Sequence, residues 1–168
     1  MRKFLPIFFF ISLLLFPQAR AQDVKSGESF SDMIDIESDR MDVDTQKGTA
    51  VFRGNVKAVQ KDIVVQGEVL TLKFDDETKK VNTLIAEKNV YIHWQDKEAT
   101  CEKAVYRLDD ESLDLTGNVL VTRGEERLAG QRVAVDMKTN RQSVEGQGGR
   151  VKIRVNNEEE SGILKWEK

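Results

Sequence analysis

One motif, Phe-Arg-Gly-Asn-Val-Lys at residues 52–57, limits the possible folds more than any other feature of this chain. Related versions stand at residues 87–91, 116–120 and 148–152, so the motif returns roughly every 30 residues. A fixed period of this length indicates a chain of stacked structural repeats, each burying its apolar face against its neighbours. We therefore expect about four such units.

Runs of alternating residues lie between the copies of the motif. The clearest are residues 39–44, 68–75, 103–109 and 131–136, in which apolar side chains occupy every second position. A period of two is that of a β-strand. Gly, Asn and Asp form the breaks, which is typical of hairpin turns. The sequence predicts an all-β fold, antiparallel and elongated by repetition.

A glycine recurs inside a predicted strand. In the motif, Phe52, Gly54 and Val56 share one face, while Arg53 and Asn55 share the other. Glycine within a strand pattern marks a bulge, a bend or a close backbone approach. Bends at matching places would curve the sheet until its two halves faced each other across the apolar side.

The first residues have the composition of a secretory signal. Arg2 and Lys3 precede an apolar run at residues 4–16, and Ala19-Arg20-Ala21 follows. This order predicts a signal peptide at residues 1–21, cleaved after Ala21. The apolar run is shorter than the roughly 20 residues that span a bilayer, although an uncleaved membrane anchor is the competing interpretation.

The rest of the chain divides by composition into three parts. Residues 22–33 are small and polar, which predicts a flexible lead-in. Residues 34–155 hold the repeats and form the predicted β-domain. Residues 156–168 open with an acidic run typical of a solvated linker. The apolar residues 163–166 then either dock on this chain or a neighbour, or form a loosely packed end.

Charge and cysteine content exclude some classes of protein. The formal net charge is −3, whereas a nucleic-acid-binding protein would be basic and patched. Cys101 is the one cysteine, so no intramolecular disulfide can form. Its place on a predicted strand indicates a small buried hydrophobe.

The sequence holds little that indicates an enzyme. His93 is the one histidine, which rules out a multi-histidine metal site, and no Gly-x-Ser-x-Gly motif occurs. The pairs at residues 75–76 and 109–110 offer the carboxylates that a glycosidase needs. They fall at predicted turns, where Asp is favoured for backbone reasons. We therefore expect no catalytic residues, no metal and no cofactor.

The repeated motif resembles that of the LptA/OstA-like family of lipopolysaccharide-transport proteins. The resemblance extends over about residues 34–155 and is carried by residues 38–41, 52–56, 115–119 and 129–133. The unit at Asn89 lacks the glycine and the unit at Gly149 lacks the asparagine, so the strand register in these two units stays open.

The resemblance implies an open β-jellyroll, in which two facing antiparallel sheets form a V-shaped groove for the acyl chains of lipopolysaccharide. It implies a periplasmic carrier that bridges the two membranes by end-to-end assembly. The implied partners are lipid A, an LptC-like inner-membrane subunit, an LptD-like outer-membrane translocon and further copies of this chain. Two alternatives remain: a membrane-anchored LptC-like subunit, and a structural β-repeat protein with a sealed core.

The inward apolar positions are the candidate groove residues, although in any sandwich such positions form a core. They are Ile36, Met41, Phe52, Val56, Leu70, Leu72, Phe74, Ile92, Trp94, Tyr106, Leu108, Leu115, Val119, Val121, Val133, Val135 and Met137. The candidate edge positions for assembly, where another chain could add by backbone pairing, are Ile34, Ile36, Val151, Ile153 and Val155. Arg40, Arg53, Lys57, Arg132 and Arg150 are candidates for lipid phosphates by charge alone, and a solvated face is the competing interpretation.

Overall fold

The computed structural model describes residues 33–146, 148–157 and 161–166, and within them the chain forms strands and turns only. The strands are β1 (Asp35–Glu37), β2 (Arg40–Asp44), β3 (Thr49–Gln60), β4 (Ile63–Phe74), β5 (Val81–Trp94), β6 (Lys97–Arg107), β7 (Ser112–Arg123), β8 (Glu126–Asp136), β9 (Arg141–Glu145) and β10 (Lys152–Arg154). The predicted signal peptide and almost all of the predicted lead-in lie outside the described residues. Across the described ranges, no helix has the length and apolar character needed to cross a bilayer.

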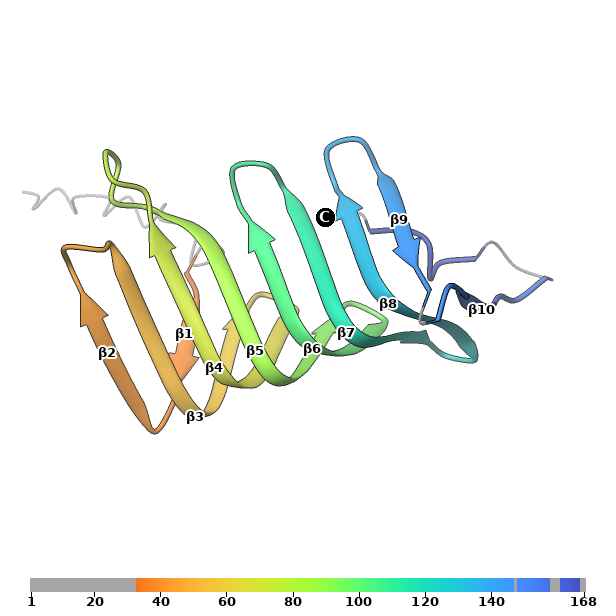
Figure 1. Cartoon of the computed structure of the whole chain (residues 1–168), viewed down its shortest axis with the longest axis horizontal. Helices are drawn as coiled ribbons and strands as arrows, with labels where there is room; N and C mark the ends of the chain where they lie inside the picture. The colour runs from red at the N-terminus through yellow and green to blue at the C-terminus, as the bar shows by residue number, and fades with distance from the viewer. Residues whose placement is uncertain (1–32, 147, 158–160, 167–168) are drawn as a thin grey trace, which may run out of the picture.

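The strands form one antiparallel sheet in the order β1-β3-β4-β5-β6-β7-β8-β10, with β2 also paired to β3 and β9 to β8. The long strands pair with their sequence neighbours, so the chain advances steadily along the long axis of the molecule (Figure 1). The predicted all-β, elongated antiparallel fold is confirmed.

Every long strand bends near its middle. The pairing register shifts at the motif, for example between Arg53 and Val56 on β3. Gly54 and Asn55 have φ of 78° and 47° there, and Gly117 and Asn118 on β7 have φ of 82° and 49°. Such left-handed pairs are typical of β-bulges, which bend a strand and increase its twist. Because the bulges recur at matching places on β3, β5 and β7, and the register of each long strand with its neighbours shifts at the same level, the whole sheet folds along one line.

The fold line divides the sheet into two facing arms. Residues 49–53 of β3 pair with β2, whereas residues 57–59 pair with β1. At the other end of the body, β9 and β10 divide β8 in the same way. We name the halves the β2/β9 arm and the β1/β10 arm after their terminal strands. The two facing sheets of the expected jellyroll are thus two arms of a single sheet (Figure 1).

The bulge asparagines fasten neighbouring strands at the fold line. Each donates its side-chain amide to a carboxylate on the preceding strand or bend, and we call these bonds the Asn clasps. They join Asn55 to Asp39 (2.9 Å), Asn89 to Glu68 (2.6 Å) and Asn118 to Glu102 (2.8 Å). Bonds to an ionised acceptor are stronger than neutral ones, and Asn tolerates left-handed backbone better than most residues.

The unit without the glycine keeps the same bulge. Lys88 takes the glycine position with φ of 66°, Asn89 follows with φ of 54°, and the register shifts between Glu87 and Val90. In the last unit, Gly148 and Gly149 have φ of 63° and 83°. The positive-φ pair therefore recurs in all four units, although its residues change.

Aspartates organise the turns of the β2/β9 arm. The Asp75 carboxylate accepts the backbone N–H groups of Glu77 (3.1 Å) and Thr78 (2.7 Å). These bonds, chiefly the one from Thr78, hold the pKa of Asp75 below its usual range. Asp44 and Asp136 accept N–H groups in the turns that follow them in the same way. Asp75 therefore has the backbone role that its turn position predicts.

Candidate functional site: an apolar groove between the arms

Aligned side chains form apolar rows on the inner faces of both arms. Paired residues of adjacent strands stand on the same face, so the register traces each row directly. In the β1/β10 arm one row runs through Ile36, Ala58, Val65, Ile92, Ala99, Val121, Leu128 and Ile153. In the β2/β9 arm a facing row runs through Met41, Phe52, Leu70, Ala86, Ala104, Leu115, Val133 and Val144. Each row crosses the full length of the body without a polar member.

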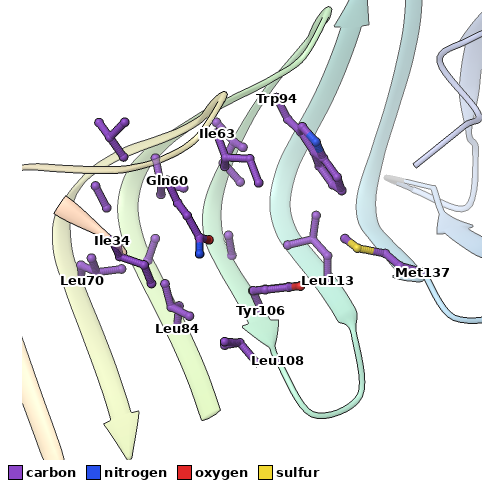
Figure 2. Close-up of a pocket in the computed structure, with 16 residues that line it drawn as sticks. Ile34, Gln60, Ile63, Leu70, Leu84, Trp94, Tyr106, Leu108, Leu113 and Met137 are labelled. Atoms are coloured by element: carbon purple, nitrogen blue, oxygen red, sulfur yellow. The ribbon is translucent and has the colours of Figure 1, made fainter. Parts of the chain in front are cut away.

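A cavity of about 120 Å³ lies between the two arms (Figure 2). The β2/β9 arm contributes Leu70, Leu84, Ala86, Ala104, Tyr106, Leu108, Leu113 and Met137 to its wall. The β1/β10 arm contributes Ile34, Ala58, Val59, Gln60, Ile63, Val65, Ile92 and Trp94. The polar side-chain groups in this wall are the Gln60 amide, the Tyr106 hydroxyl and the Trp94 indole N–H. The cavity therefore suits an apolar ligand that makes few hydrogen bonds.

The nominated groove residues divide into three sets. Those that line the cavity are Leu70, Ile92, Trp94, Tyr106, Leu108 and Met137. Those that are buried away from it are Val56, Leu72, Leu115, Val119, Val121, Val133 and Val135. Ile36, Phe52 and Phe74 are partly buried against this core, and Met41 is 56% exposed at the N-terminal edge. The cavity wall thus extends from Ile34, ahead of β1, to Leu113 and Met137, and five of the seven buried residues outside it lie on β7 and β8.

Sequence reasoning did not nominate ten of the sixteen cavity-wall residues for the groove, and part of this loss has an identifiable reason. On β4 the inward side chains before the bend are Ile63 and Val65, whereas after it they are Leu70 and Leu72. The inward set changes from odd to even numbers across the bend, where the pairing of β4 with both β3 and β5 also shifts in register. Apolar residues at 63 and 65 are visible in the sequence, but their face depends on where the bend falls.

Small residues make up another part of the missed wall. Ala58, Ala86 and Ala104 line the cavity between bulkier neighbours. Ala86 and Ala104 are directly paired across β5 and β6, so two adjacent strands present methyl groups on the same row. The cavity therefore opens where the side chains of the row are smallest. A search of the sequence for bulky apolar residues does not find such positions.

The candidate edge strands lie at opposite ends of the body. β1 bonds to β3, β10 bonds to β8, and within the described residues neither has a second strand partner. Val151, Ile153 and Val155 are 43%, 49% and 46% exposed. Ile34 also lines the cavity, so the N-terminal edge and the groove share a residue.

Two of the arginines considered for lipid phosphates are held by carboxylates. Arg132 contacts Asp114 at 2.6 and 2.8 Å and Glu145 at 3.1 Å, which raises the pKa of Arg132 and holds the pKa of Asp114 below its usual range. Arg40 contacts Asp42 at 2.6 Å. The Arg132 contacts join β8 to β7 and β9, whereas the Arg40 contact lies within β2, and none of these residues lines the cavity.

The end of the described chain folds back into the groove. We call residues 162–166 the strap. Ile163 and Trp166 are 0% and 3% exposed and belong to the same buried cluster as the strand residues. The Trp166 ring meets Trp94 edge-on, with centroids 5.6 Å apart. Of the outcomes expected for this segment, docking on its own chain is the one observed.

No metal centre is built into the described part of the chain, where no group of three or more His, Cys, Asp or Glu side chains could hold an ion. His93 lies half-buried between Ile92 and Trp94 in sequence and on the opposite face of β5 from them. It is therefore separated from the cavity by the sheet itself.

Comparison with known proteins assigns the chain to a family. Residues 35–141 match the family model described as LptA/(LptD N-terminal domain) LPS transport protein. The chain belongs to this family. An uncharacterized protein of Rhizobium meliloti (strain 1021) is 25% identical over 130 residues, covering 73% of this chain and 70% of that protein.

A solved structure has the same fold. The crystal structure of LptH, described as the LptA-homologous periplasmic component of the lipopolysaccharide transport device of Pseudomonas aeruginosa, superposes with a TM-score of 0.65. The match is 16% identical and covers 74% of this chain and 95% of that one. Together with the family match, it supports the open jellyroll and a place among lipopolysaccharide-transport proteins.

Proposed function

We propose that this chain is a periplasmic carrier that shields the acyl chains of lipid A in the groove between its arms, without enzymatic turnover. The observation that supports this is the pair of apolar rows with an apolar cavity between them. Each buried methylene contributes about 0.8 kcal/mol, so a 12-carbon chain approaches ~10 kcal/mol. Only an extended apolar trough supplies contact on that scale.

The matched tyrosines provide a direct test. Tyr106 lines the cavity, whereas Tyr91 lies on the opposite face of β5 from the buried Val90 and Ile92. A photo-reactive benzoylphenylalanine in place of Tyr106 should cross-link to added lipopolysaccharide, and the same residue in place of Tyr91 should not. Equal cross-linking at both positions, or none at either, would overturn the proposal.

We further propose that copies of the chain assemble end to end between an LptC-like subunit at the inner membrane and an LptD-like translocon at the outer membrane. The two free edges of the β1/β10 arm support this by their charge. β1 carries Asp35 and Glu37 on either side of Ile36, and β10 carries Lys152 and Arg154 on either side of Ile153. Opposite charges across paired strands favour association and register.

Charge reversal tests the assembly. Changing Asp35 and Glu37 to Lys should weaken self-association, and so should changing Lys152 and Arg154 to Glu. A mixture of the two variants should recover it, because one acidic and one basic edge are again available. Sedimentation velocity measures the outcome, and failure of the mixture to associate better than either variant alone would remove this interface.

Two alternative functions can be distinguished from the carrier by simple measurements. An LptC-like subunit would keep its N-terminal apolar segment, so the mass of the exported chain distinguishes it from a carrier cleaved after Ala21. A structural protein with a sealed core would bind no lipid at the position of Tyr106. The open cavity beside Ile34 favours the carrier over the sealed core.

A further inference from the structure

The strap lies where the cavity stops. Trp94 forms part of the cavity wall and also meets the edge of Trp166. Beyond Ile92 and Ala99, the apolar row of the β1/β10 arm continues through Val121 and Leu128, which are 0% and 1% exposed and share one buried cluster with Ile163. In Figure 1 the C-terminal trace turns back from β10 and passes behind β9 and β8. The strap thus fills the groove at the end opposite β1.

A few polar bonds hold the strap to both arms. The Ile163 N–H donates to Glu126 Oε2 (3.2 Å) in the β1/β10 arm, and the Trp166 indole N–H donates to Gln142 Oε1 (3.1 Å) in the β2/β9 arm. The Gln142 amide also donates to the Leu164 carbonyl. The strap belongs to no strand, so its departure would leave the ladder of the sheet intact.

The cavity alone is too small for the proposed cargo. Its volume of about 120 Å³ is close to the roughly 150 Å³ apolar cavity that accommodates one benzene. An acyl chain of a dozen carbons is far larger, so in the groove it would extend beyond this volume onto further apolar surface. Val121 and Leu128 continue the row that Ile92 brings into the cavity wall, so they are apolar surface continuous with the cavity.

We propose that, in the empty protein, the strap occupies a second acyl-chain subsite formed by Trp94, Val121 and Leu128. When lipopolysaccharide enters, it displaces the strap from this subsite. This inference rests on the proposed carrier function. In the empty protein the strap keeps the apolar row from water, which limits the exposed patch that would otherwise promote aggregation. In the loaded protein the acyl chains take over the same contacts.

The two tryptophans allow the strap and the cavity to be followed separately. Trp94→Phe leaves Trp166 as the one tryptophan, and Trp166→Phe leaves Trp94. Adding lipopolysaccharide should increase acrylamide quenching of Trp166 several-fold as the strap leaves, and should decrease quenching of Trp94 as lipid covers it. A response of Trp94 with none from Trp166 would overturn the strap inference and leave the carrier function standing. Absence of lipid binding by both variants would count against the carrier function itself.

Removing and locking the strap give the second test. A chain ending at Ser161 should bind lipopolysaccharide about tenfold more tightly, the change that 1.4 kcal/mol produces. Leu164→Ala is the matched control, because Leu164 is 42% exposed within the strap, and its affinity should equal that of the intact chain.

The locked form uses Gln142→Cys and Leu164→Cys in a Cys101→Ala background, joined by a short bis-maleimide. Locking should lower the affinity at least about tenfold relative to the same variant before linking. Equal affinity of the truncated, intact and locked forms would refute the inference, while binding by all of them would preserve the carrier function.

Discussion

Replacement of Leu115 by Ala, compared with the same change at Leu84, measures whether the two ends of the body are packed differently. Leu115 is 0% exposed and pairs with Ala104 and Val133 on the inner face. Leu84 is half-buried and lines the cavity. Both are leucines on the same arm, so the comparison removes the difference in side-chain chemistry.

The expected losses differ in size. Leu→Ala removes about three carbons at ~0.8 kcal/mol each, and a sealed site adds the cost of the new void, so Leu115→Ala should lower the free energy of unfolding by about 2–5 kcal/mol. At Leu84 the removed carbons border space that already exists, and part of the side chain is exposed. We expect a loss of about 1 kcal/mol there.

Urea denaturation followed by far-UV circular dichroism gives both values, provided that the dependence of free energy on urea is unchanged between variants. A loss at Leu84 equal to that at Leu115 would show that the cavity region is packed as a sealed core. That result would contradict the carrier proposal and favour the structural β-repeat protein.

Two further predictions concern the fold line. Asn118→Ala should destabilise the protein by about 1–2 kcal/mol, because it removes the clasp to Glu102 and puts at positive φ a residue that tolerates it less well than Asn. Asn118→Gly also removes the clasp but has no Cβ at positive φ, so it should cost less; the reverse order would contradict this account. Burial raises the pKa of the Cys101 thiol to about 11, so native Cys101 should react with iodoacetamide far more slowly than in urea at pH 8–9. Because the pKa of this thiol is higher in the folded than in the unfolded chain, its contribution to stability is present below about pH 9 and is lost as the pH rises toward 11. Equal alkylation rates in native and unfolded chains would refute the burial of Cys101.

The repeat, the strand class and the bend could be predicted from the sequence because each depends on local chemistry. Gly54 with Asn55 marks a left-handed bulge by residue type alone, and Asp75 marks a turn. Local chemistry explains the unit with Lys88 only in part: its asparagine is present, but Lys88 places a Cβ at the positive φ that glycine usually takes. The strand register in the units at Asn89 and Gly149 could not be predicted from the sequence, because it depends on how neighbouring strands pair.

The groove itself could be predicted only in part, because it depends on how distant segments meet. Leu70, Ile92 and Tyr106 face inward by simple alternation, and the structure places them in the cavity wall. Val121 and Val133 satisfy the same alternation yet lie in the fully packed part of the body. Nothing in their local sequence distinguishes the two sets, because the difference depends on how segments distant in the sequence pack together.

The way in which the two arms are joined explains how one body can be both stable and open. The arms share backbone only along the fold line, where bulges and Asn clasps hold the strands in register. Elsewhere they meet through apolar side chains and through the strap, which bonds Glu126 on one arm and Gln142 on the other. Apolar contacts are non-directional, so acyl chains can replace them without the loss of any ladder hydrogen bond. A sheet folded on itself along one line is therefore suited to separate at its open side, and the strap determines at which end it stays closed.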